Sequence, residues 1–243
     1  MNAGPSAFDL SFVEHSKDVA EDFHNINAAI DRLTNLRKAE IQVEGPFFRS
    51  KLAWKIATYQ EAVLYRAVAL MTGARLAWNA KNQLACFILV RALVETFAVF
   101  DEFVREVLAS LEREDFGAMD ALVMNRTFAT KDNEMLRDHP NLVATNVLTF
   151  IDKMGKHYDL PVRTNYDSLS ERCHPNSAGH HQMYSATEKP NGRVTFSETK
   201  NLPMALTYIR APLGLVFLFE RSMERLTEAT IQIAELQHRL HPR

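Results

Sequence analysis

Few residues in this sequence would interrupt a helix or cross-link the chain. Cys86 and Cys173 are its only cysteines, which excludes a framework of disulfide bonds. Glycine accounts for 8 and proline for 9 of the 243 residues, so long segments contain no breaker. The formal net charge is only -2, from 28 basic and 30 acidic residues, so no global field would attract nucleic acid or an anionic membrane. Any contact with nucleic acid would need a local basic patch.

A long uninterrupted hydrophobic run is also missing. The longest apolar stretch, residues 84–100, contains Arg91 and Glu95, and a membrane-spanning helix would not readily hold both charges. The first nine residues lack a basic region followed by an apolar one, so we expect no secretion signal. These absences predict a cytoplasmic protein with no membrane contact.

Most of the sequence places its hydrophobic residues at helical spacing. Phe23, Ile26, Ile30 and Leu33 follow one another at intervals of three and four residues and predict one face of an amphipathic helix. Similar patterns predict helices over residues 11–44, 47–82, 84–111, 115–128, 141–153, 166–173 and 202–240, with an exposed polar connection at 131–140. Because 47% of the residues are hydrophobic, the chain can bury a large core. We therefore predict an all-α fold, a bundle of long up-and-down helices.

Residues 180–200 change the period and carry the one strand signal. Two short strands around Asn191-Gly192 predict a β-hairpin inserted before the last helix, because Asn-Gly suits a primed turn. In the segment that follows, Pro212 and Gly214 predict a kink. No repeat or flexible linker divides the chain, so residues 1–243 are expected to form a single domain, with a disordered tail at 1–10.

The predicted helix at 166–173 stops where reactive and charged side chains gather. Pro175 cannot donate a helical hydrogen bond, and it disfavours helical backbone at the residue before it. Asn176 and Gly179 then supply turn chemistry. His174 is therefore expected at a helix end, facing a cleft or water.

A polar cleft between two helices is the leading candidate for a functional site. Arg91 and Glu95 are four residues apart, hence on one helical face, among apolar neighbours where an unpaired charge would be costly. With Arg172 and His174 they could bind an anion, the histidine exchanging protons and an arginine stabilising negative charge. Tyr166, Ser170 and Asn176 are the expected ligand-binding residues of this cleft.

A purely structural interpretation of the same residues is open. Arg91 and Glu95 would then form an intrahelical ion pair, and His174 would hydrogen-bond a neighbouring carboxylate to fix the helix end.

The pattern Arg-Ala-Leu-Val-Glu at 91–95, followed by Tyr-Asp-Ser-Leu-Ser-Glu-Arg-Cys-His-Pro-Asn at 166–176, resembles uncharacterised bacterial families of the HEPN superfamily. The resemblance covers about residues 47–240. It implies an all-helical bundle, often a homodimer, linked to phage defence, abortive infection or toxin–antitoxin pairs. An antitoxin protein and RNA or a nucleotide are the partners that such a setting implies.

Active members of that superfamily are metal-independent ribonucleases, in which an arginine precedes the catalytic histidine by four to six residues. This sequence departs from that spacing, because Arg172 stands two residues and Arg163 eleven residues before His174. Whether the chain is an enzyme is therefore left open, and we expect no cofactor.

Metal binding is a further alternative. Glu21 and His24, Glu171 and His174, and Glu235 and His238 form three Glu-x-x-His pairs of the kind that ferritin-like bundles use, with Glu61 and Glu95 as single ligands. His174, His180 and His181, with Cys173, also have the right ligand types for zinc. Their spacing matches no zinc motif, and His180 and His181 would more simply begin the hairpin. We therefore assign no metal-binding residue.

Overall fold

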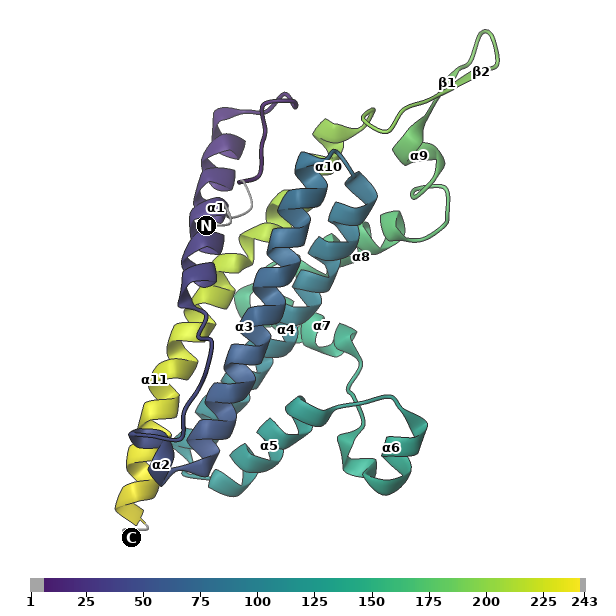
Figure 1. The fold of residues 1–243 in the computed structure, drawn as a ribbon. Helices are drawn as coiled ribbons and strands as arrows, with labels where there is room; N and C mark the ends of the chain where they lie inside the picture. Colours follow the sequence, from purple (N-terminus) through teal and green to yellow (C-terminus); the bar gives the residue numbers. More distant parts are fainter. Residues whose placement is uncertain (1–6, 241–243) are drawn as a thin grey trace.

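The structure, a computed structural model, describes residues 7–240 and is an all-α bundle with one small β-hairpin (Figure 1). Its elements, in chain order, are α1 (Lys17–Leu36), α2 (Pro46–Arg49), α3 (Lys51–Asn79), α4 (Gln83–Glu112), α5 (Phe116–Phe128), α6 (Asn133–Asp138), the 3₁₀ turn η1 (Pro140–Leu142), α7 (Val147–Tyr158), α8 (Val162–Cys173), α9 (His181–Tyr184), β1 (Ser185–Glu188), β2 (Arg193–Phe196), α10 (Leu202–Gly214) and α11 (Val216–Leu240). The predicted fold class is confirmed.

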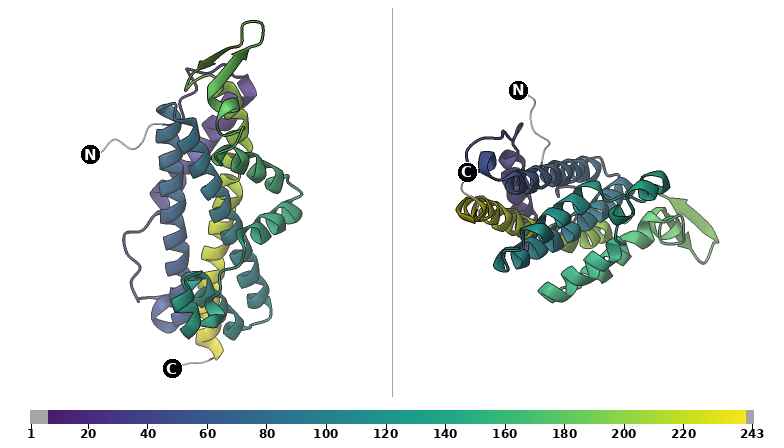
Figure 2. Two further views of the ribbon diagram at one scale, coloured as in Figure 1. Left: turned by 90° about the vertical axis from the view of Figure 1, so that its right-hand side faces the viewer. Right: turned by 90° about the horizontal axis from the view of Figure 1, so that it is seen from below.

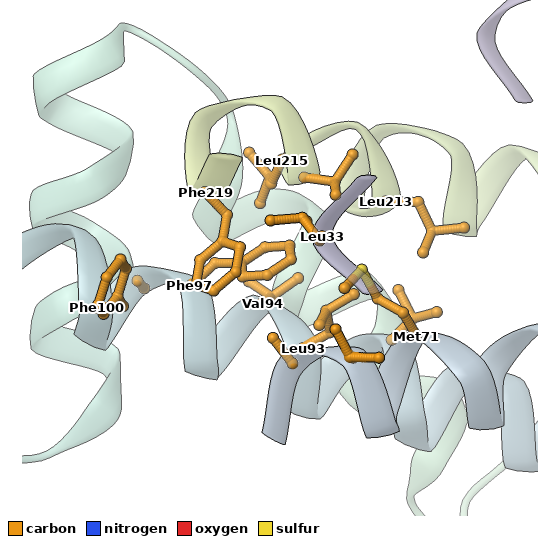
Figure 3. Packing of buried hydrophobic residues seen from close by; sticks show 14 of the residues in the cluster. Leu33, Met71, Leu93, Val94, Phe97, Phe100, Leu213, Leu215 and Phe219 are labelled. Carbon is orange, nitrogen blue, oxygen red and sulfur yellow. The ribbon is translucent and has the colours of Figure 1, made fainter. Parts of the chain in front are cut away.

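Helix α4 is the centre of the bundle. It contacts α3, α5, α7, α8, α10 and α11, and the long helices run side by side in all three views (Figures 1 and 2). Its apolar residues point to several sides, and Val90, Val94 and Phe97 are at most 1% exposed. Figure 3 shows Phe97 and Phe100 of α4 packed against Phe219 of α11. A helix buried on several sides needs apolar residues all round, as this one has.

Polar side chains fix the starts of the long helices. The side chains of Ser16, Ser50, Asn82 and Asp115 each accept a hydrogen bond from a backbone N–H in the first turn of the helix that follows. These caps satisfy donors that a helix start leaves unpaired. They account for the observed starts of α1, α3, α4 and α5.

The first predicted helix, residues 11–44, is too long at both ends. It begins only after Ser16 and ends at Leu36, although residues 37–44 are mostly good helix formers. The backbone N–H of Lys38 donates to the Glu61 carboxylate at 2.7 Å, and the hydroxyl of Tyr65 donates to the Lys38 carbonyl at 3.2 Å. Side chains of α3 therefore hold this connection in a non-helical path.

Three features in the middle of the chain also differ from the prediction. The polar connection at 131–140 contains the short helix α6, because the Asp132 carboxylate accepts from the N–H groups of Glu134 and Met135. The helix predicted at 141–153 is displaced to Val147–Tyr158, since Asn146 caps its start. Helix α8 begins four residues before the predicted start at Tyr166.

The predicted kink in the last segment is confirmed. Helix α10 ends at Gly214 and α11 begins at Val216, with Pro212 inside the last turn of α10. The missing N–H of proline weakens the helix there. The change of direction lets α10 contact α8 while α11 contacts α2 at the opposite end of the bundle.

The β-hairpin lies within residues 180–200 as predicted and projects beyond the end of the bundle (Figure 1). Its register pairs Ser185 with Phe196 and Glu188 with Arg193, so four residues form the turn instead of a two-residue Asn-Gly turn. Only Gly192 of that turn has a positive φ, 59°. The expectation that His180 and His181 begin the hairpin is wrong, because His181–Tyr184 forms helix α9.

The segment before α1 is packed against the bundle. Phe8 is 4% exposed, its ring lies edge-on to Phe23 at 5.5 Å, and the carbonyl of Asp9 accepts from Trp78 Nε1 at 2.7 Å. The disordered tail predicted for 1–10 therefore does not include residues 7–10, and residues 1–6 lie outside the described part of the chain.

Two helical stretches are long and apolar enough to cross a membrane by length and composition, Gln83–Glu112 and Leu202–Leu240. About half of each apolar window, 56% and 50%, is buried inside the bundle, and the core helices of soluble proteins meet the same criterion.

Candidate functional site

Arg91, Glu95 and Tyr166 form a hydrogen-bonded cluster where α4 and α8 meet. The Tyr166 hydroxyl donates to Glu95 Oε1 at 2.7 Å and accepts from Arg91 Nε and Nη2 at 3.1 and 3.0 Å. Arg91 Nε also lies 3.5 Å from Glu95 Oε1. The intrahelical ion pair that the spacing allowed is therefore present, and a tyrosine of a second helix completes it.

The cluster is partly open to solvent. The side chains of Arg91 and Glu95 are 31% and 28% exposed, while Tyr166 is buried. Burial raises the pKa of Tyr166, and its hydrogen bond to Glu95 adds to that rise. Burial opposes the charge of Arg91, but the Tyr166 hydroxyl and the Glu95 carboxylate raise the pKa of the guanidinium above its usual value. The cluster thus stays an ion pair bridged by a neutral phenol, which ties α8 to α4.

Arg172 is held away from this cluster. Its guanidinium carbon lies 3.4 Å from the centroid of the Tyr208 ring on α10, and its Nη1 donates to the Ser168 carbonyl at 2.7 Å. A guanidinium stacked on an aromatic face is a favourable cation–π arrangement. Arg172 therefore connects α8 to α10.

His174 ends α8 at the protein surface. Its backbone N–H donates to the Ser170 carbonyl at 3.2 Å, and its side chain is exposed. Within residues 7–240 the imidazole makes no hydrogen bond or ion pair, so the carboxylate contact expected to fix the helix end is not formed by His174. A carboxylate contact at this helix end is made by Asn176 instead, because its side-chain amide donates to the Glu171 carboxylate at 2.8 Å.

The loop after α8 turns back tightly at Gly179. The Gly179 N–H donates to Asn176 Oδ1 at 3.0 Å, and the His180 N–H donates to the Asn176 carbonyl at 2.9 Å. A β-carbon on Gly179 would collide with the carbonyl oxygen of His174 and lie 3.1 Å from that of Arg172. The loop can therefore close in this way only with glycine at this position.

The seven residues predicted for one cleft thus lie in different surroundings. The structure brings together Arg91, Glu95 and Tyr166, whereas Arg172 stacks on Tyr208 and Asn176 holds the loop. The Ser170 carbonyl accepts the hydrogen bond from the backbone N–H of His174 at the end of α8.

A second polar cluster is buried outside the predicted cleft. Asp101 of α4 is 3% exposed, and its carboxylate accepts hydrogen bonds from Tyr158 of α7 at 2.7 Å and from Ser222 of α11 at 3.2 Å. Burial, followed by the hydrogen bond to Asp101, raises the pKa of Tyr158 to about 12. The available signal was an aspartate between Phe100 and Phe103 in an apolar run. This cluster joins three helices.

The structure gives no support to the metal alternatives. Within the described residues 7–240, no three His, Cys, Asp or Glu side chains are grouped so that they could hold a metal ion. The three Glu-x-x-His pairs therefore do not assemble a dimetal site there, and neither do Cys173, His174, His180 and His181 form a zinc site.

The two thiols are expected to react at very different rates. Burial raises the pKa of Cys86 to about 12. Burial also raises the pKa of Cys173, with Glu95 adding to the rise and Arg91 opposing it. Because the thiolate is the reactive form, Cys173 should be alkylated more slowly than free cysteine at pH 8 and faster as the pH rises, while Cys86 reacts only on unfolding.

Iodoacetamide labelling followed by mass spectrometry of both peptides measures this difference. The Cys86→Ala variant isolates Cys173 as the control, and labelling of both native thiols at one rate would contradict the expected order.

The hairpin end of the molecule carries exposed cationic and aromatic side chains. We call residues 172–200 the arm region; its basic residues are Arg172, Lys189, Arg193 and Lys200, and its acidic residues are Glu188 and Glu198. Three histidines at 174, 180 and 181 are all exposed. Phe196 and Val194 lie on one face of the hairpin and are 73% and 43% exposed. The arm region is thus locally basic in a chain of net charge -2.

Comparison with known proteins returns no match, neither to a family model nor to a curated protein or a solved structure.

Proposed function

We propose that this chain is a HEPN-like protein that binds RNA or a nucleotide-like anion, in the setting of phage defence or a toxin–antitoxin pair, and that the arm region makes the contact. The observation that carries the proposal is the combination of Lys189, Arg193 and the 73% exposed ring of Phe196 on a projecting hairpin. Single-stranded nucleic acid is bound by cations that contact phosphates and by aromatic rings on which bases stack.

The proposed activity is binding without cleavage. Arg172, the arginine nearest in sequence to His174, has its guanidinium on the Tyr208 ring, and Arg91 is bonded to Tyr166 and Glu95. A phosphate held beside His174 would therefore lack a positioned arginine to stabilise the charge that develops during cleavage. This agrees with the absence of the arginine-to-histidine spacing of the active ribonucleases.

Fluorescence anisotropy with a labelled single-stranded RNA tests the proposal. The Lys189→Glu/Arg193→Glu double variant should bind at least about tenfold more weakly than the wild type, because two cations that would pair with phosphates become anions that repel them. The plot of the logarithm of the association constant against the logarithm of the salt concentration should become less steep. Its slope should decrease in magnitude by about 1.4, or about 0.7 for each phosphate that is no longer neutralised. Phe196→Ala should weaken binding by about 1–3 kcal/mol, because a base can no longer stack on the ring.

The matched control is Lys131→Glu/Arg137→Glu, two exposed cations beside or within α6, away from the hairpin (Figure 1). If both double variants bound RNA equally weakly, the proposal that the arm region contacts the RNA would be wrong. The RNA should be recovered intact, and cleavage that disappears in His174→Ala would overturn the non-catalytic part. If Phe196→Ala changes the mass in light scattering but leaves RNA affinity unchanged, the arm is a homodimer contact instead.

A further inference from the structure

An open groove of about 1080 Å³ lies at the end of the bundle opposite the hairpin. It is enclosed by α2, the first turns of α3, the start of α5 and the end of α11, and Figure 1 shows these elements together beside the C-terminal end of α11. We call it the α2 groove. None of the residues of the arm region lines it.

The lining of the α2 groove is aromatic and aliphatic. Phe47, Trp54 and Phe116 are half-buried in its walls, and Leu52, 5% exposed, also lines it. Phe48 also lines the groove, yet 77% of its surface is exposed. Large apolar side chains gathered around a concavity mark binding surfaces more often than scattered ones do.

The charged residues of the α2 groove are mostly cationic and unpaired. Arg49 and Lys51 are exposed, and within residues 7–240 neither side chain makes a hydrogen bond or an ion pair. Lys55 and Asp120 neutralise each other at 2.5 Å. An occupant of this groove would therefore meet an apolar surface beside an excess of positive charge, and acidic groups would complement it.

The shape of the groove selects the class of occupant. A planar membrane surface would meet Phe48 but could not follow the concave surface down to Leu52. An enclosed lipid site would bury most of its ligand, whereas Val43 and Phe48 on this groove are 59% and 77% exposed. Amphipathic helices bind by laying their apolar face into such open hydrophobic grooves.

We propose that the α2 groove binds an amphipathic helix of a partner protein, whose apolar anchors are flanked by Asp or Glu residues. The anchors lie against Phe47, Trp54 and Phe116, and the acidic residues face Arg49 and Lys51. This interaction is independent of the RNA contact proposed for the arm region, because the two surfaces share no residue.

Trp54 supplies a built-in reporter for the test. It lines the groove, whereas Trp78, the other tryptophan, is 1% exposed and donates its Nε1 proton to the Asp9 carbonyl. The probe is a synthetic helical peptide of about 18 residues, above the length at which isolated helices become marginal. It carries leucine at helical spacing, glutamate beside the leucine face and alanine elsewhere, because like charges at every other position would destabilise the helix. It should shift the emission of Trp54 saturably.

Two comparisons make the outcome specific. The Arg49→Glu/Lys51→Glu variant should bind the peptide about tenfold more weakly, while Lys131→Glu/Arg137→Glu, with the same change in net charge, should bind it as the wild type does. A peptide with lysine in place of every glutamate should bind the wild type at least about tenfold more weakly than the acidic peptide does.

Equal binding by the Arg49→Glu/Lys51→Glu variant and the wild type, or equal binding of both peptides, would overturn the proposal. It also fails if phosphatidylglycerol vesicles or single-stranded RNA shift the Trp54 emission and the acidic peptide does not. The substitutions expected to weaken RNA binding lie in the arm region, and those expected to weaken peptide binding lie in the α2 groove, so loss of one interaction leaves the other intact.

Discussion

Replacing Phe219 with alanine will lower the free energy of unfolding by about 3–5 kcal/mol. Phe219 is 2% exposed, and its ring stacks on Phe97 with 4.6 Å between centroids. It also meets the ring of Phe100 at 5.1 Å. Truncation would remove this packing and leave a cavity between α11 and α4, which close packing on several sides prevents from collapsing.

Guanidinium denaturation followed by circular dichroism measures the destabilisation. Phe217→Ala is the matched control, because Phe217 lies two residues away on the same helix and is 42% exposed. That substitution should change stability by a fraction of the Phe219→Ala effect, since little apolar surface returns to water. Comparable destabilisation in the two variants would mean that the stack between α4 and α11 is not a centre of stability.

Gly179→Ala will open the loop after α8 and cost about 1–3 kcal/mol. The added β-carbon collides with the His174 carbonyl, a backbone atom that cannot rotate away, and also approaches the Arg172 carbonyl at 3.1 Å. The two hydrogen bonds from Gly179 and His180 to Asn176 should then break. The expected result is faster hydrogen exchange over residues 174–184.

Gly214→Ala is the control for this loop prediction. No atom of residues 7–240 lies within 4 Å of a β-carbon added to Gly214, and its φ is not in the left-handed region. Alanine there should leave stability unchanged or raise it by up to about 1 kcal/mol, because it reduces the freedom of the unfolded chain. Unchanged hydrogen exchange at 174–184 in Gly179→Ala would show that the close approach does not constrain the loop.

The central helix could be predicted from sequence almost to the residue. Its apolar pattern from Leu84 to Leu111 needs no partner to be recognised, and the observed helix extends it by one residue at each end. The kink at Pro212 and the strands around Gly192 could also be predicted, because proline and glycine act through local backbone geometry.

The end of α1 could not be predicted, because its cause is remote in sequence. Residues beyond Leu36 favour a helix by propensity, yet Glu61 and Tyr65 of α3 hold the backbone of Lys38 instead. Tertiary contacts of this kind override the weak preference of single residues. The helical spacing of Tyr65 suggests a core position, yet the residue is 43% exposed and its hydroxyl donates to the Lys38 carbonyl.

The candidate site could be predicted in part, since Arg91 and Glu95 of α4 and Tyr166 of α8 meet as expected for one cleft. The pairing of Arg91 with Glu95 follows from their four-residue spacing. The position of Arg172 does not, because its partner Tyr208 belongs to another helix and spacing carries no information about it. The cluster around Asp101 could not be predicted either, because its partners, Tyr158 and Ser222, come from two later helices.

The contacts between α1 and the last two helices set an order of events during synthesis. Arg32 binds Glu220 and Asp22 binds Arg210, each across 188 residues of chain. At ~5–20 residues per second, a ribosome needs roughly 10–40 s to make that interval. The part of α1 that packs on α10 and α11 therefore waits for these partners, while α3 can contact α1 and pair with α4 soon after it emerges. Until then the apolar side chains of α1 that are buried in the complete fold, such as Phe23 and Ile30, lack part of their cover.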